Sequence, residues 1–233
     1  MKSNSATAAI VAAFERHAEI NLHEDPIRVH GDEVITLEGE VANIAVKRQA
    51  ERIARRLAYP TPVLDRLLLR VGNRRVDDAL EHAVLDALIQ ETAFAGMSMQ
   101  ASRAARFSDH SDHLTVTATG SRVRLDGRVN SLSHRRLAEV IAWWIPGTAD
   151  VDNRVRVSPP EEDNDGEICD AVRLVLDKET SLDADQVHVA CRQGEITLTG
   201  VVNTEEQRRF AIYDCWYIPG VHAVKDQMHL RPH

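Results

Sequence analysis

Three stretches of this sequence repeat one pattern, and the repetition constrains the fold more than any other feature. Aligned on one glycine, they read ITLEGEV around Gly39, VRLDGRV around Gly127 and ITLTGVV around Gly200. A basic pair follows each glycine by eight and nine residues, and a proline closes each unit. Self-similarity at fixed offsets is typical of chains built from small repeated structural units. We therefore expect three units of one design, and such a chain more often binds or scaffolds than catalyses.

Each repeat predicts the same order of secondary structure elements. A helical stretch precedes two strands of alternating polarity that are joined by a tight turn, and a second helix and a last strand follow. In the first repeat, the helices are expected at residues 7–19 and 44–57, with the last strand at 64–71. The pattern predicts an α+β fold in which each unit is α-β-β-α-β, with a three-stranded sheet covered by helices.

The expected boundaries follow from the repeats. They place unit one at residues 1–72, unit two at 73–158 and unit three at 167–233. Residues 159–166, which carry prolines and then acidic residues, are predicted to be a linker that lets unit three swing. An insertion at residues 95–113, absent from the other units, is predicted to be a mobile loop.

Charge and composition exclude some classes of function. The net charge is −8, and residues 161–233 hold 7 basic and 15 acidic residues, which accounts for the whole excess. An acidic balance argues against nonspecific nucleic-acid binding, which needs a basic surface. The sequence contains no nucleophile elbow, phosphate loop or HExxH motif, so we expect neither enzymatic activity nor a cofactor.

Targeting signals and cysteine usage suggest a compartment. Near the N-terminus, Glu15 and Arg16 interrupt the short apolar run, which is unlike a secretory signal, and no stretch approaches the ~20 apolar residues of a membrane span. The three cysteines, an odd number, show no disulfide framework and no close metal pair; they are Cys169, Cys191 and Cys215. We therefore expect a cytoplasmic protein in a reducing environment.

The repeats resemble the BON domain, the bacterial osmotic-stress and nodulation module. The third repeat carries the likeness most fully, in Gly194-x-Ile196-x-Leu198-x-Gly200-x-Val202 and in Ile218-Pro219-Gly220-Val221. The second shares Pro146-Gly147, whereas the first departs most, with Pro60-Thr61-Pro62 and with Arg55-Arg56 in place of aromatics. The resemblance implies a protein without catalytic activity. Members of the BON family are associated with phospholipid surfaces, envelope stress and, in one relative, potassium binding.

Aromatic residues gather at two equivalent helix ends, which makes these ends the leading candidate site. They form the pairs Trp143-Trp144 and Trp216-Tyr217, each followed by Ile-Pro-Gly. Neighbouring helix positions point about 100° apart, so the pattern predicts Trp144 and Tyr217 on the apolar face and Trp143 and Trp216 at its edge. An edge tryptophan could enter a membrane interface or a protein partner, or it could pack on the neighbouring unit.

Basic pairs and the repeat glycines form the other repeated candidates. The basic pairs could meet lipid phosphates or simply form solvated helix faces; in the second and third repeats they are Arg135, Arg136, Arg208 and Arg209. The glycines are Gly39, Gly127 and Gly200, placed where a strand hands over to a helix. We expect them to have a structural role, because glycine permits a backbone shape or a close approach that a side chain would block.

Two further clusters carry weaker signals. Four potential metal ligands lie within the insertion, but their spacing matches no known zinc motif and no cysteine supports them; they are Asp109, His110, Asp112 and His113. Cys215 and His222 are seven residues apart, yet Cys215 falls within a repeated helix, so we expect an inert thiol. No metal site is predicted.

The sequence therefore predicts a non-catalytic, stress-related binding or scaffolding protein. It would dock on a phospholipid surface or a protein partner through its aromatic and basic helix ends. The alternative is a sensor of a cation, such as potassium or calcium, or of a small ligand, held by loop carbonyls and acidic residues near the linker.

Overall fold

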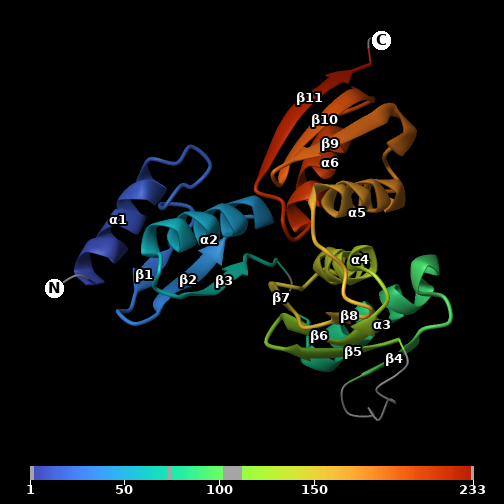
Figure 1. Ribbon diagram of the computed structural model, residues 1–233, viewed down its shortest axis with the longest axis horizontal. Helices are drawn as coiled ribbons and strands as arrows, with labels where there is room; N and C mark the ends of the chain where they lie inside the picture. Colours follow the sequence, from blue (N-terminus) through green and yellow to red (C-terminus); the bar gives the residue numbers. More distant parts are fainter. Residues whose placement is uncertain (1–2, 73–74, 102–111, 232–233) are drawn as a thin grey trace. The chain divides into compact units, whose positions relative to one another are not determined.

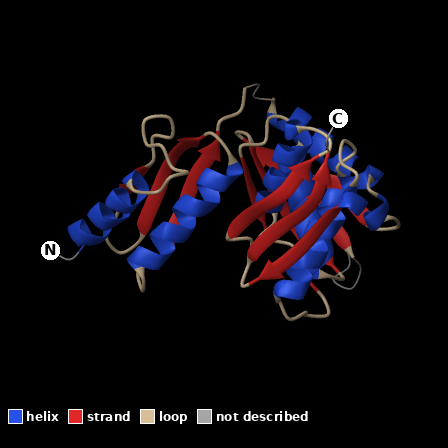
Figure 2. Cartoon of the chain, turned by 90° about the horizontal axis from the view of Figure 1, so that it is seen from above, coloured by secondary structure: helices blue, strands red, loops and turns tan. Residues whose placement is uncertain are grey.

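A computed structural model describes residues 3–72, 75–101 and 112–231 of the chain (Figure 1). The chain divides into two compact units, Met1–Arg70 and Val71–His233. The first holds repeat one, and the second holds repeats two and three together. In Figure 2 the strands of each repeat, drawn in red, are flanked by helices drawn in blue.

Repeat one has the predicted order of elements. They are α1 (Ser3–Glu15), β1 (Arg28–His30), β2 (Ile35–Val41), α2 (Ile44–Ala58) and β3 (Val63–Leu69). β2 is the central strand, antiparallel to β1 and parallel to β3. Alternate residues of β2 are buried, and they join apolar residues of both helices in one core that includes Ile10, Phe14, Leu37, Ile53 and Leu67.

Repeat two follows the same plan with additions. Its elements are α3 (Asp77–Gln90), the short 3-10 helix η1 (Thr92–Phe94), β4 (Ser98–Ala101), β5 (His113–Thr119), β6 (Arg122–Val129), α4 (Leu132–Trp144), β7 (Asp150–Asn153) and β8 (Arg156–Val157). β7 and β8 both pair in parallel with β6 and together replace the single last strand. The insertion was expected to be a loop, but its residues 98–101 form β4, which pairs with β5. Residues 102–111 of the insertion lie outside the described part.

Repeat three returns to the three-stranded sheet. Its elements are α5 (Asp165–Lys178), the 3-10 helix η3 (Ala184–Gln186), β9 (Val187–Arg192), β10 (Glu195–Val202), α6 (Glu205–Tyr217) and β11 (Ala223–Leu230). β10 is central, antiparallel to β9 and parallel to β11. Helix α5 packs on α4 as well as on α6 and β9, so repeats two and three share a helical layer (Figure 1).

The second helix of each repeat begins at a polar N-cap residue. The side chains of Asn43, Ser131 and Thr204 each accept a hydrogen bond from the backbone N–H three residues further on. Such caps satisfy one of the amide groups that a helix start leaves unpaired and typically contribute about 1 kcal/mol. The caps explain why the three helices start at equivalent positions after the repeat glycines.

The repeat glycines lie inside the central strands, two residues before the last residue of each strand, and not at the boundary between strand and helix. Gly39, Gly127 and Gly200 have φ angles of 147°, 135° and 116°. An added Cβ would stand 2.4, 2.1 and 2.0 Å from the backbone oxygens of Pro26, His113 and Gln186, which lie at or just before the start of the neighbouring strand. Glycine is needed here because two backbones approach too closely for any side chain.

Candidate functional site

The aromatic helix ends of repeats two and three are buried against each other. Trp143 and Trp216 are only 5% and 4% exposed. The ring of Trp143 stacks on that of Tyr217 with centroids 6.0 Å apart. Trp144 Nε1 donates a hydrogen bond to Asp214 Oδ1 at 2.9 Å. The contact between α4 and repeat three thus buries the aromatic helix ends, which the sequence pattern indicated as a surface for a lipid or a partner.

These positions correct the expected orientation of the aromatic pairs. Trp143 and Trp216 were placed at the edge of the apolar face, yet they are the buried members of their pairs, while Trp144 and Tyr217 are half-buried. The cause is that α4 is packed on several sides, because its own sheet, α3, α5 and α6 all contact it. Packing on the neighbouring unit, which the sequence analysis left open, is the alternative that these contacts fit.

Two of the four candidate arginines also have internal partners. Arg136 is 3% exposed; its Nη2 lies 2.6 Å from Asp163 Oδ1, and its Nε donates to Pro219 O at 3.2 Å. Arg208 is bound to Asp226 and lies 3.2 Å from Glu205. Both side chains therefore stabilise the fold through ion pairs and hydrogen bonds within the chain.

Arg135 and Arg209 occupy different surroundings. Arg135 is half-buried and Arg209 is exposed. A docking role for these two residues stays a prediction, and Arg209 is the one of the four that an outside partner could reach without rearrangement.

The acidic linker is attached to repeat two at several points. Glu161 Oε2 accepts a hydrogen bond from Leu132 N at the start of α4, at 2.7 Å. Asp163 pairs with Arg136, and Asn164 caps α5. These contacts, with the packing of α4 on α5, hold the linker in place, in contrast to the expected swing of unit three.

Lys47, the first residue of the basic pair in repeat one, forms a buried ion pair. Lys47 Nζ lies 2.8 Å from Asp65 Oδ2 and donates to Leu67 O at 2.6 Å. Burial raises the pKa of Asp65, and Lys47 acts in the opposite direction. Arg208 and Asp226 repeat this pairing between the second helix and the last strand of repeat three. In repeats one and three, the first residue of the basic pair therefore serves the fold and not a ligand.

Asp214 is the most strongly perturbed acid at the contact between repeats two and three. It is 4% exposed, and burial raises its pKa to about 7, opposed by the hydrogen bond from Trp144 and reinforced by Glu179. Its Oδ2 has no hydrogen-bond partner among the described residues. The folded chain thus holds this proton more tightly than the unfolded chain does.

We expect Asp214 to weaken the Val71–His233 unit as the pH rises. Because its folded pKa is raised, its contribution is fully favourable below about pH 4 and is lost as the pH rises to about 7, by a few kcal/mol at most. Urea unfolding of wild type and Asp214→Asn across this range measures the effect. The difference in free energy of unfolding between the two proteins should change between pH 4 and 7 and level off above; a constant difference would contradict the assignment.

The end of α2 in repeat one is exposed where its equivalents are buried. Arg55 and Arg56 stand at the positions of the two aromatic pairs, and both are exposed. Leu57 and Tyr59 follow, 38% and 85% exposed. Arg55 pairs with Glu51 at 2.7 Å, one helical turn earlier. This exposed group, Arg55, Arg56, Leu57 and Tyr59, is called the α2 end cluster below.

Backbone contacts bring two more exposed apolar residues to the same end of the sheet. Thr61 N donates to Ala58 O at 2.7 Å, and Ile35 N donates to Pro62 O at 2.9 Å. The starts of β2 and β3 therefore lie beside the end of α2. Val34 and Leu64, which are 43% and 41% exposed, belong to these two starts.

The sequence did not reveal the α2 end cluster, because the candidate site was chosen from the aromatic pairs of repeats two and three. The available signal was the replacement itself. A helix end that carries two arginines where its equivalents carry aromatics cannot pack in the same way, so its following Leu57 and Tyr59 lose their cover.

The weaker candidate clusters gain no support. Residues 109–111 lie outside the described part, while Asp112 lies 3.5 Å from Arg128. No group of three or more His, Cys, Asp or Glu side chains suited to a metal occurs in residues 3–72, 75–101 and 112–231. Cys215 is fully buried, and burial raises its pKa, which keeps the thiol protonated. Cation sensing and an inert Cys215 both stay predictions.

Comparisons with known proteins give a family and distant structural likenesses. The profile of the family described as "BON domain" matches residues 3–71, 100–159 and 164–232. No curated protein matches the chain. Within the described residues, no helix is long and apolar enough to cross a membrane.

Three of the solved structures that resemble the chain are similar to it only remotely. Two are of CdsD, a structural protein of the type III secretion system of Chlamydia trachomatis. The C-terminal domain has 18% identity and a TM-score of 0.27, covering 91% of this chain and 93% of that one. The other has 19% identity and a TM-score of 0.27, covering 100% and 94%. The PrgH periplasmic domain has 10% identity and a TM-score of 0.24, covering 91% and 98%. These scores are too low to carry an argument about function.

Proposed function

We propose, from the premise that this chain belongs to the BON domain family, that it is a non-catalytic binding and scaffolding protein that docks on an anionic phospholipid surface. BON domains are non-catalytic in general and are known for binding phospholipids or partners in stress contexts. The observation that carries the proposal is the α2 end cluster, where Tyr59 is 85% exposed beside two arginines.

The chemistry of the cluster suits a membrane interface. Tyrosine has an apolar ring and a polar hydroxyl, and it is enriched where headgroups meet hydrocarbon. Each arginine near an anionic surface contributes about 1 kcal/mol, which salt weakens. Leu57, two residues before Tyr59 on the same helix end, adds exposed apolar area. The glutamate that pairs with Arg55 lies one turn back on α2 and leaves Arg56 to face the surface.

Vesicle flotation tests the proposal. The full chain should float with vesicles that contain phosphatidylglycerol and not with pure phosphatidylcholine, and high salt should release it. The double variant Arg56→Glu/Tyr59→Ser should lower the partition coefficient more than about tenfold, because it replaces an attraction by a repulsion and removes the interfacial ring.

A matched control distinguishes binding at the α2 end cluster from a general effect of the changed net charge. Arg75→Glu/Val76→Ser also changes an exposed arginine and an exposed apolar residue, since Val76 is 76% exposed, but it lies in the other compact unit. We expect it to float like wild type. Absence of flotation with anionic vesicles would overturn the proposal and leave a protein partner, and equal losses in both variants would overturn the assignment to the α2 end cluster.

A further inference from the structure

Repeats two and three hold their first helix and first strand in the same relation. Asp77 Oδ1, at the start of α3, accepts a hydrogen bond from Gly120 N in the turn after β5, at 2.8 Å. Asp165, at the start of α5, accepts from Gly194 N in the turn after β9, at 2.9 Å. These turn contacts tie each helix start to the far end of its strand, so α3 with β5 can be compared directly with α5 with β9.

The repeat glycines give the register of this comparison. Gly127 lies opposite Leu114, and Gly200 lies opposite Val187. Residues 114–116 of β5 therefore correspond to residues 187–189 of β9.

In repeat two the outer edge of β5 is occupied by β4. β4 runs parallel to β5, with Ser98 opposite His113 and Ala101 opposite Val116. It also contacts α3, so it lies as an added strand beside the helix. The chain thus shows within itself how an extended segment fits this edge.

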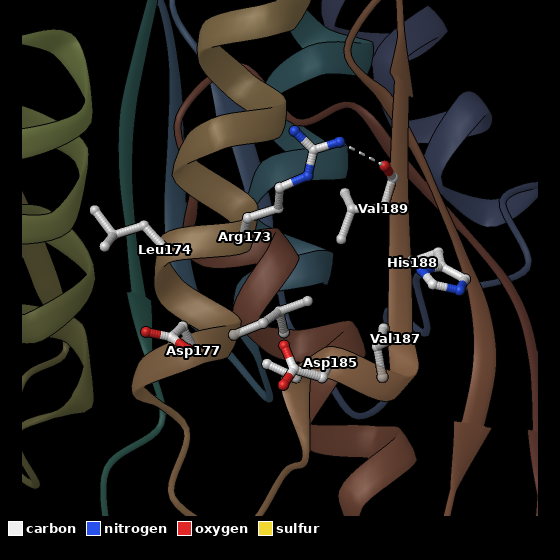
Figure 3. A pocket seen from close by; sticks show the side chains of 9 residues that line it. Arg173, Leu174, Asp177, Asp185, Val187, His188 and Val189 are labelled. Atoms are coloured by element: carbon white, nitrogen blue, oxygen red, sulfur yellow. Dashed lines mark hydrogen bonds between the residues drawn. The ribbon is translucent and has the colours of Figure 1, made fainter.

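In repeat three the equivalent edge is open. No strand in the part of the chain that the structure describes pairs with the outer edge of β9. A cavity of about 590 Å³ lies between α5 and β9, as Figure 3 shows; its walls are formed by Arg173, Leu174, Asp177, Asp185, Val187 and Val189, among others. The strand residues that line it, 187–189, correspond to those that β4 covers in repeat two.

A backbone acceptor points into this groove. Val189 O receives Arg173 Nη2 at 3.4 Å, drawn as a dashed line in Figure 3, and Cys169 Sγ at 3.5 Å. Both donors come from α5, so this oxygen faces the helix side and not β10. The arginine contact is longer than the usual 2.9–3.0 Å of such bonds. The oxygen is therefore weakly engaged and can accept a hydrogen bond from the backbone of another segment.

Charges along the groove follow a definite order. Asp185 precedes β9, and Asp177 lies at the same end, near the end of α5. Arg173 lies one turn earlier on α5 and contacts Val189, further along the strand. A segment parallel to β9 therefore meets the aspartates first and the arginine afterwards. Arg173 also pairs with Asp170 at 3.0 Å, but both side chains are more than half exposed, so this pair costs little to break.

We propose that the groove between α5 and β9 binds an extended segment of a partner protein, which adds as a strand parallel to β9 and carries a basic residue ahead of an acidic one. Backbone hydrogen bonds to the strand edge supply affinity, and the charge order supplies direction. This site lies in the Val71–His233 unit and recognises a peptide, so it goes beyond the lipid docking proposed for repeat one.

Two peptides of reversed charge test the proposal. Lys-Met-Ser-Met-Gln-Ala-Glu copies residues 97–101, which include all of β4, between a basic and an acidic residue. Glu-Met-Ser-Met-Gln-Ala-Lys exchanges the two charges. Each is titrated, up to about 1 mM, into the isotope-labelled full chain, and backbone amide shifts are followed by NMR. The first peptide should shift the amides of Val187 and Val189 and bind at least about fivefold more tightly than the second.

Two variants connect the preference to the groove. Arg173→Glu should abolish or reverse the preference between the peptides. Arg192→Glu, on the same strand but exposed outside the groove, should keep it. The proposal is overturned if neither peptide shifts the β9 amides, if both bind equally to wild type, or if Arg192→Glu removes the preference as fully as Arg173→Glu does.

Discussion

Gly200→Ala is expected to lower the free energy of unfolding of the Val71–His233 unit by about 3 kcal/mol or more. The new Cβ would stand 2.0 Å from Gln186 O, and the φ of 116° is one that a side-chain-bearing residue rarely adopts. Because the obstacle is backbone, β9 would have to move away from β10. Urea unfolding followed by tryptophan fluorescence measures the loss, since all three tryptophans lie in this unit.

Two glycines provide controls for the separate causes. Gly96 has a φ of 82° but no atom within 4 Å of an added Cβ, so Gly96→Ala should cost about 1 kcal/mol from the backbone conformation alone. Gly72 has open space and no positive φ, so Gly72→Ala should change stability little. If Gly200→Ala unfolded no more easily than Gly96→Ala, the close approach of the two strands would not be the reason for glycine.

Trp143→Ala is expected to destabilise the contact between repeats two and three by about 3–5 kcal/mol. The side chain is 5% exposed and stacks on Tyr217, so its removal leaves a cavity and an uncovered ring. The linker contacts of Glu161 and Asp163 depend on the same arrangement of α4 and α5. Limited proteolysis should therefore cut residues 159–166 faster in this variant, and urea unfolding should begin at lower concentration.

The equivalent position in repeat one supplies the control. Arg55→Ala removes an exposed side chain at the place that Trp143 occupies in repeat two, and it should change stability by less than about 0.5 kcal/mol. Equal proteolysis rates for wild type and Trp143→Ala would show that the stacked aromatics do not hold the two repeats together.

The sequence predicted the repeated plan well because local signals determine it. The alternation in β2 and β10, the turns at Gly31 and Gly194, and the N-caps all act within a few residues. The family match over three regions confirms the three copies. Short-range physics was enough here because each repeat builds its own sheet.

The sequence could not predict contacts that join separate repeats. The orientation of Trp143 was wrong because the helical pattern was read with one apolar face, whereas α4 is buried on most sides. On α6, the apolar side chain of Phe210 is 40% exposed, so apolar character alone does not identify the inward face. Strand β4 was missed because Ser-Met-Gln-Ala is short and has no β-branched or aromatic residue, although its polarity alternates, so its pairing with β5 decides its conformation.

The α2 end cluster has a consequence for how many neighbours one chain can hold. Repeats two and three join through their aromatic helix ends, so neither of these ends is free, whereas repeat one carries arginines at the equivalent positions. The chain therefore offers no free aromatic helix end through which a second chain could pair in the same way. Substituting aromatics for Arg55 and Arg56 would create one such end, through which two chains could associate as a symmetric dimer.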